Sequence, residues 1–176
     1  MTVQVALLRA INVGGRNKVP MATLRGCAKA IGWQDVHSYI ATGNLVFRAG
    51  PGDHATTLRS AVRDETGVDP DVLVMTGAEL KRVLEACPFD PEDGRLAHVY
   101  FCFDDPVIDE DLLDRFRSES ERLLRTGRVI YLDAPDGIGR SKLVERFDKV
   151  VTGTATTGRN LRTIRQLVAM VDAKGA

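Results

Sequence analysis

Residues 9–20 read Arg-Ala-Ile-Asn-Val-Gly-Gly-Arg-Asn-Lys-Val-Pro, and the rest of the chain is organised around this segment. It follows an apolar run and precedes a helical pattern, so we expect a loop. Gly14 and Gly15 can turn the backbone through conformations closed to other residues, and their missing side chains let an anion approach main-chain N–H groups. Arg16 and Lys18 add charged donors. These properties are typical of a loop that accepts a phosphate.

A plain structural interpretation fits the same residues, with Gly14–Gly15 as a tight turn and the flanking cations as a solvated rim. The spacing matches neither a P-loop, which needs Gly-Lys-Ser/Thr, nor a dinucleotide fingerprint. Asn12 and Asn17 lie beside the turn and join it as candidate anion contacts. The segment therefore indicates an anion site but identifies neither a reaction nor a substrate.

Length and composition describe an ordinary protein of 176 residues, enough for one large domain or two small ones. No apolar run approaches a membrane span and no signal peptide is visible, so we expect a cytoplasmic protein without a membrane partner. Cys27, Cys87 and Cys102 are far apart, which favours buried reduced thiols over a disulfide or zinc site. The three histidines are equally scattered, and we assign no metal and no cofactor.

The net charge of zero hides a strong segregation along the chain. Residues 1–63 carry a net charge of +6, residues 64–121 carry −12, and residues 122–176 carry +6. A basic face of this kind suits a polyanion. Alternatively, the basic ends and the acidic middle neutralise one another inside the fold.

Apolar periodicity predicts that two halves repeat the element order β-α-β-β-α-β-α. The expected strands are Val3–Arg9, Val36–Ile40, Leu45–Arg48, Asp71–Met75, Ala97–Phe103, Arg122–Arg125, Arg128–Leu132 and Val151–Thr157. The expected helices are Met21–Ile31, Ala55–Glu65, a helix that opens at Thr76–Glu79 and runs through Ala86, Ile108–Ser118, Ser141–Val150 and Asn160–Val171.

We therefore predict an α+β protein of two ferredoxin-like (split β-α-β) subdomains, with antiparallel or mixed sheets and helices on one face. The predicted N-terminal subdomain is 1–87, the linker is 88–95, and the C-terminal subdomain is 96–176. The linker is rich in turn residues. A single mixed α/β sandwich is the alternative.

A second candidate anion site is the segment Gly137–Lys142, between a predicted strand and a predicted helix. Ser141 can cap the helix, and Lys142 adds charge beside free N–H groups. Residues 137–165 hold 7 Lys/Arg against 2 Asp/Glu. The alternative is an ordinary capped helix with a solvated basic face. A Ser–Lys nucleophile is disfavoured, because sequence neighbours point apart on a helix.

Two further polar groups complete the candidate site. Arg159 can reach an anion held by the Gly14–Gly15 loop, or else pair with the acidic middle segment, and Asn160 is a natural cap for the last helix. Thr42 and Asn44 offer a hydroxyl and an amide as possible additional contacts, or else form a hairpin turn. We expect this turn at the sheet end opposite the glycine loop, if the hairpin is tight. Whether the two motifs share one site stays open.

Five blocks of sequence resemble the DUF1697 family of bacterial proteins: Arg9–Gly15, Asn17–Met21, Thr42–Phe47, Gly137–Leu143 and Thr157–Asn160. The resemblance implies a two-part α+β fold with ferredoxin-like character. It implies little about activity, because the family is defined by unknown function.

Three positions depart from the pattern of this family. The family usually has Gly where this chain has Ala10, Ser where it has Thr42, and Trp where it has Leu161. The hydroxyl is kept at Thr42, whereas any stacking by the tryptophan ring is absent.

The leading hypothesis is a cytoplasmic protein that binds a phosphate-bearing partner, either nucleic acid or a nucleotide. A hydrolase or transferase for a phosphorylated substrate is one alternative, and a protein-interaction module is another. The sequence assigns no catalytic residue, and it decides neither whether the protein is an enzyme nor its oligomeric state.

Overall fold

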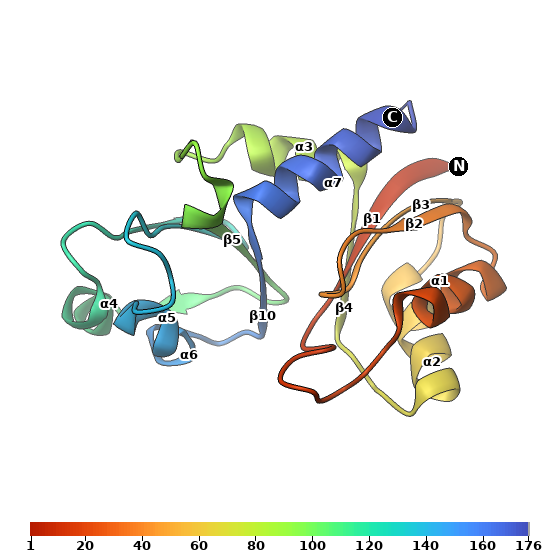
Figure 1. The fold of residues 1–176 in the computed structure, drawn as a ribbon, viewed down its shortest axis with the longest axis horizontal. Helices are drawn as coiled ribbons and strands as arrows, with labels where there is room; N and C mark the ends of the chain where they lie inside the picture. Colours follow the sequence, from red (N-terminus) through yellow and green to blue (C-terminus); the bar gives the residue numbers. More distant parts are fainter. Residues whose placement is uncertain (176) are drawn as a thin grey trace. The chain divides into compact units, whose positions relative to one another are not determined.

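A computed structural model describes residues 1–175 and has the α+β class that the sequence predicts (Figure 1). The chain forms two compact units: unit 1 is Met1–Arg82 together with the chain from Gln166 onward, and unit 2 is Val83–Arg165. The boundary falls inside two helices, α3 (Gly77–Glu85) and α7 (Leu161–Ala173). The predicted linker at residues 88–95 lies within unit 2. The division into subdomains at that linker stays a prediction.

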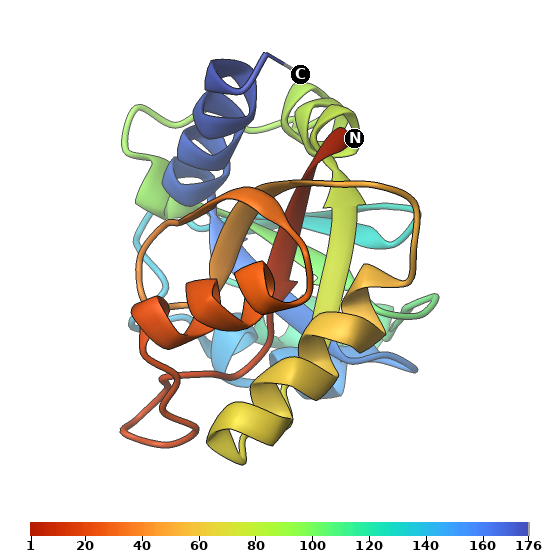
Figure 2. The ribbon, with the colours of Figure 1, turned by 90° about the vertical axis from the view of Figure 1, so that its right-hand side faces the viewer.

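Unit 1 contains a four-stranded antiparallel sheet with the order β2-β3-β1-β4. The four strands and the two helices that accompany them are, in chain order, β1 (Thr2–Leu8), α1 (Met21–Ala30), β2 (Gln34–Ser38), β3 (Asn44–Ala49), α2 (His54–Thr66) and β4 (Val72–Thr76). Figure 2 shows α1 and α2 side by side across one face of this sheet. The first strand is therefore central, and the loop that follows it leaves from the middle of the sheet.

Alternating apolar side chains of the strands form the core beneath α1 and α2. Leu8 of β1 and Phe47 of β3 are fully buried in this cluster. The Trp33 ring stacks flat on Phe47, with 3.5 Å between centroids and an interplanar angle of 2°. Its indole N–H donates to His54 Nδ1 at 3.2 Å, so the buried polar atom of the ring has a partner.

Contacts of Lys174 attach the end of the chain to unit 1. The Lys174 side chain is only 7% exposed; its ammonium donates to the Asp35 carbonyl at 2.6 Å and contacts the Asp35 carboxylate at 2.7 Å. The contact of the Lys174 ammonium with the Asp35 carboxylate is the main reason that the pKa of this carboxyl is lowered. Arg48 donates to the Lys174 carbonyl. A Cβ at Gly77 would lie 2.5 Å from Val171 Cγ1, so α3 and α7 approach closely only because residue 77 is glycine.

Unit 2 contains a second four-stranded antiparallel sheet, with the order β10-β5-β8-β7, and a two-stranded sheet, β6-β9. Its elements are the 3-10 helix η1 (Gly94–Leu96), β5 (Ala97–Cys102), β6 (Val107–Ile108), α4 (Glu110–Phe116), β7 (Arg122–Thr126), β8 (Val129–Asp133), α5 (Lys142–Glu145), α6 (Phe147–Val150), β9 (Val151–Thr152) and β10 (Thr156–Asn160). Leu113, Leu143 and Phe147 from the three α-helices pack with β8 in one buried cluster.

The two four-stranded sheets share the same strand order. Strands β7-β8-β5-β10 of unit 2 correspond in turn to β2-β3-β1-β4 of unit 1. The ferredoxin-like arrangement itself stays a prediction. The single helix expected over Ser141–Val150 is instead α5 and α6, because Arg146 leaves helical geometry with φ −108° and ψ 18°. No helix within residues 1–175 combines the length and the apolar character needed to cross a bilayer.

Candidate functional site

The segment Arg9–Pro20 forms a hairpin-like loop whose tip is the glycine pair. The main chain closes twice, from Asn12 N–H to Asn17 O at 3.0 Å and from Arg16 N–H to Val13 O at 3.0 Å. Gly14 has φ 57° and Gly15 has φ 74°, the left-handed values that a type I′ turn needs at both central positions. The glycines are therefore required by the turn itself.

The asparagines of this loop are engaged with its backbone. The Asn12 amide donates to Val19 O at 2.9 Å and to Ala41 O at 2.8 Å, and its oxygen accepts from Val19 N–H at 2.8 Å. The Asn17 amide donates to Ala10 O at 3.0 Å. These contacts stabilise positive φ values at Ala10, Asn12 and Asn17. The two amides shape the loop, and their service as anion contacts stays a prediction.

The Thr42–Asn44 turn lies at the same sheet end as the glycine loop, and the expectation of opposite ends is wrong. Strands β1 and β3 are antiparallel, with Leu7 opposite Asn44, so the end of one lies beside the start of the other. The hydrogen bond from Asn12 to Ala41 O joins the two loops directly. The buried Asn44 amide donates to Tyr39 O and to Thr42 Oγ1, as expected of a residue that fixes its own turn.

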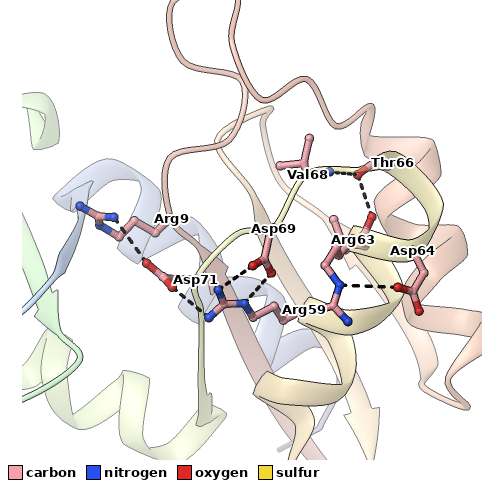
Figure 3. Close-up of polar contacts among 9 residues, drawn as sticks. Arg9, Arg59, Arg63, Asp64, Thr66, Val68, Asp69 and Asp71 are labelled. Carbon is pink, nitrogen blue, oxygen red and sulfur yellow. Dashed lines mark hydrogen bonds and ion pairs between the residues drawn. The ribbon is translucent and has the colours of Figure 1, made fainter.

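A network of ion pairs fixes the start of the glycine loop (Figure 3). Asp71 contacts Arg9 at 3.4 Å through one carboxylate oxygen and Arg59 at 3.2 Å through the other. Arg59 also donates two hydrogen bonds to Asp69, at 2.6 and 2.9 Å. The bonds from Arg59 lower the pKa of the Asp69 carboxyl. Here the acidic part of the sequence does neutralise a basic part.

The segment Gly137–Lys142 is a turn followed by a short helix. Gly137 has φ 83° and donates its N–H to Ala134 O at 2.8 Å. Ser141 caps α5 as predicted, because its hydroxyl accepts from Val144 N–H at 3.1 Å. With only four residues, α5 contributes little helix dipole, so charge at this site must come from side chains.

This turn lines a surface hollow of about 450 Å³, which we call the cationic hollow. Its lining consists of Arg115, Phe116, Arg117, Ser118, Glu121, Asp136, Gly137, Arg140, Ser141 and Lys142. Four side chains are cationic and two are carboxylates, so the wall carries an excess of positive charge. Ser141 and Lys142 were predicted from the sequence, whereas the contribution of the Arg115–Glu121 stretch was not.

Two of the four cations in the cationic hollow have charged or aromatic neighbours. Arg117 Nε lies 3.1 Å from Asp114 Oδ1, and the Arg115 guanidinium lies 5.7 Å from the centroid of the Phe116 ring. Within residues 1–175, neither Arg140 nor Lys142 forms an ion pair. These two exposed cations are therefore available to a ligand.

The two carboxylates of the cationic hollow are both hydrogen-bonded. Glu121 is only 4% exposed, and its Oε2 accepts from Ser118 N–H at 2.9 Å. The Ser120 hydroxyl donates to Asp136 Oδ2 at 2.6 Å, which ties the 118–121 turn to the 134–137 turn. Residues distant in sequence thus form one wall.

The remaining predicted residues, Arg159 and Asn160, lie in β10 and outside the described lining of the cationic hollow. Arg159 is 7% exposed and donates to Thr157 Oγ1 at 2.8 Å and to Gly158 O at 2.9 Å. Burial lowers its pKa to about 10. Asn160 caps α7 as predicted, because its oxygen accepts from Thr163 N–H at 2.9 Å.

Other features of the described residues offer less chemistry. A larger hollow of about 510 Å³ in unit 2 is lined mostly by apolar residue types, with Glu110 and Arg125 as its charged members. Across residues 1–175, no three His, Cys, Asp or Glu side chains gather where they could hold a metal ion. Composition rather than size therefore selects the cationic hollow as the candidate site.

Comparison with known proteins bears on the family and the fold. No curated protein matches the chain. The structure of the conserved bacterial protein SP0830 from Streptococcus pneumoniae is similar, with a TM-score of 0.72 and 22% sequence identity over 98% of this chain and 99% of that one. This likeness concerns the fold alone. The family model described as "Protein of unknown function (DUF1697)" matches residues 1–131, and the chain therefore belongs to the DUF1697 family.

Proposed function

We propose that this protein binds phosphate-bearing ligands, nucleic acid or a nucleotide, and that the cationic hollow of unit 2 is the main site. The observation that carries the proposal is the set of four cations around one concave surface, of which only Arg117 forms an ion pair within residues 1–175. Guanidinium groups match the geometry of phosphate oxygens and bind them through paired hydrogen bonds. Ser141 and Lys142 keep the role that the sequence suggested.

In this proposal the glycine loop of unit 1 is a site of its own for ligands of the same class. Arg16 and Lys18 are exposed beside the turn, and a Cβ added at Gly14 or Gly15 would meet nothing within 4 Å. An anion can therefore approach the main chain at the tip. Asn12 positions this surface, and no role is assigned to it beyond that.

The test compares charge-removing variants that differ only in place. We would measure binding of a dye-labelled single-stranded oligonucleotide and of nucleoside monophosphates at low salt, using fluorescence anisotropy and calorimetry. Arg140→Gln and Lys142→Gln each remove one hydrogen bond to a charged group and should weaken binding roughly tenfold. Lys149→Gln on α6 is the matched control, because Lys149 is exposed and lies outside the described lining of the hollow.

Equal losses in all three variants, or no binding of any phosphate compound by the wild type, would refute the proposal. Salt dependence then separates the two ligand classes. Affinity for an oligonucleotide that falls steeply with added salt indicates a polymer, because each neutralised phosphate releases a counterion. Saturable binding of one nucleotide with weak salt dependence indicates the small ligand.

A further inference from the structure

The cationic hollow also contains a buried carboxylate, which a site for a bare anion does not need. Glu121 is 4% exposed and lines the same surface as Arg117, Arg140 and Lys142. Its carboxylate lowers the attraction of the site for phosphate. A bare anion therefore gains less at this wall than the four cations alone would give it, and a ligand that also brings hydrogen-bond donors is favoured.

Hydrogen bonds fix the position of this carboxylate. Oε2 of Glu121 accepts from Ser118 N–H at 2.9 Å, and Glu121 N–H returns a bond to Ser118 O at 3.2 Å. The turn is joined to Asp136 through the Ser120 hydroxyl at 2.6 Å. The acceptor is thus held by a closed turn and by a second turn, and a ligand meets it with little rearrangement.

We propose, resting on the proposed function, that the cationic hollow takes a guanine nucleotide and that Glu121 accepts hydrogen bonds from the base. Guanine places two donors, N1–H and the 2-amino group, side by side, and a carboxylate accepts both. The phosphate then meets Arg140 and Lys142, and the half-buried Phe116 ring supplies apolar surface. A hollow of about 450 Å³ falls within the usual range for small-molecule sites.

The base preference of the wild-type protein is the first test. We would measure the affinities of GMP, IMP, XMP and AMP under one set of conditions. GMP should bind roughly tenfold or more tightly than AMP, which presents a single amino group and no N1–H. IMP, which lacks the 2-amino group, should fall between them. Equal affinities would overturn the inference.

The second test exchanges one atom of the acceptor. Glu121→Gln still accepts from Ser118 N–H, so the turn is preserved, but it replaces one acceptor oxygen with a donor. Binding of GMP should weaken roughly tenfold, while binding of XMP, which has an oxygen at C2, should improve. Asp136→Asn is the matched control in the same wall and should leave the ratio of GMP to XMP unchanged. Thermal unfolding of each variant verifies its fold.

The outcomes separate this inference from the proposed function. If all four nucleotides bind equally and Glu121→Gln changes nothing, phosphate binding stands and the role of Glu121 is refuted. If neither the nucleotides nor the oligonucleotide nor inorganic phosphate binds the wild type, both proposals fail. If Glu121→Gln does not fold, the ranking of the wild-type affinities still decides the question.

Discussion

The segments Arg9–Pro20 of unit 1 and Gly137–Lys142 of unit 2 both combine glycines, cations and a place before a helix, yet they form different surfaces. In the first, asparagine amides close a hairpin whose cations are exposed around a protruding turn. In the second, the turn joins a wall built partly from residues 115–121 and forms one side of a hollow. Similar local chemistry thus gives a convex tip in one unit and a concave site in the other.

Replacement of Gly43 tests how closely the Thr42–Asn44 turn packs against Ile11 of the glycine loop, and it should have the largest effect. In Gly43→Ala the new Cβ would lie 2.8 Å from Ile11 Cδ1 and 2.9 Å from Leu8 Cβ, at φ 91°. Strain and overpacking together should lower the free energy of unfolding by about 4 kcal/mol, as measured by urea denaturation. Gly14→Ala is the control: φ is 57° but nothing lies within 4 Å, so about 1 kcal/mol is expected. Equal losses would show that packing against Ile11 is not decisive.

Asn12→Ala should have the next largest effect, because it removes the side-chain bonds to both Val19 and Ala41. Loss of three hydrogen bonds should cost about 3 kcal/mol in the free energy of unfolding. Asn17→Ala removes the side-chain hydrogen bond to Ala10 O and should cost about 1 kcal/mol. Hydrogen exchange of the Val19 amide, which bonds to Asn12, should accelerate in the first variant. If the two variants are equally stable, Asn12 does not hold the loops together.

Ser141→Ala measures what the cap contributes to the concave site. The variant leaves Val144 N–H without its side-chain acceptor and should lower the free energy of unfolding by about 1 kcal/mol. Because Arg140 and Lys142 keep their charge, phosphate binding should weaken less than in Lys142→Gln. Chemical denaturation and calorimetry report the two quantities separately. A larger loss of binding than in Lys142→Gln would indicate that the Ser141 hydroxyl itself contacts the ligand.

Acidification should have the smallest effect, and it acts through unit 2. His98 is buried, and burial lowers its pKa below the ordinary value of 6.5. As the pH falls through 6.5, the unfolded chain takes up a proton at this histidine before the folded protein does. The free energy of unfolding therefore decreases as the pH falls from 6.5 toward the lower pKa of the folded state. The loss should be absent in His98→Leu when both proteins are denatured at pH 7.5 and pH 5.5. An equal loss in both proteins would assign the effect to other groups.

Local features of the fold could be predicted from sequence because they depend on neighbouring residues. Ser141 and Asn160 cap helices as expected, and the spacing of Thr76 and Glu79 forms the reciprocal bonds of a capping box, at 2.7 and 3.1 Å. The Gly14–Gly15 turn could also be predicted, since few residues other than glycine adopt the positive φ values that the turn needs at two successive positions.

The candidate site could be predicted only in part, because its wall depends on long-range contacts. Glu121 lies some twenty residues from Ser141 in the chain, and only the bond from Ser120 to Asp136 reveals that their turns adjoin. The end of the chain shows the same difficulty. Arg159 was expected between the strand Val151–Thr157 and the last helix but lies in β10, because the expected strand is divided into β9 and β10 around Gly153, which has φ 80°.

The attachment of α7 to unit 1 has a consequence for synthesis on the ribosome. Unit 1 is discontinuous, and the segment from Gln166 onward leaves the ribosome after all of unit 2. Until then Asp35 lacks the Lys174 ammonium, and Gly77 lacks the Val171 side chain that packs beside it. During translation of residues 83–165, the N-terminal part of unit 1 therefore lacks the contacts that the segment from Gln166 onward supplies. The unit boundary between residues 82 and 83 therefore does not mark a point in translation at which unit 1 is complete.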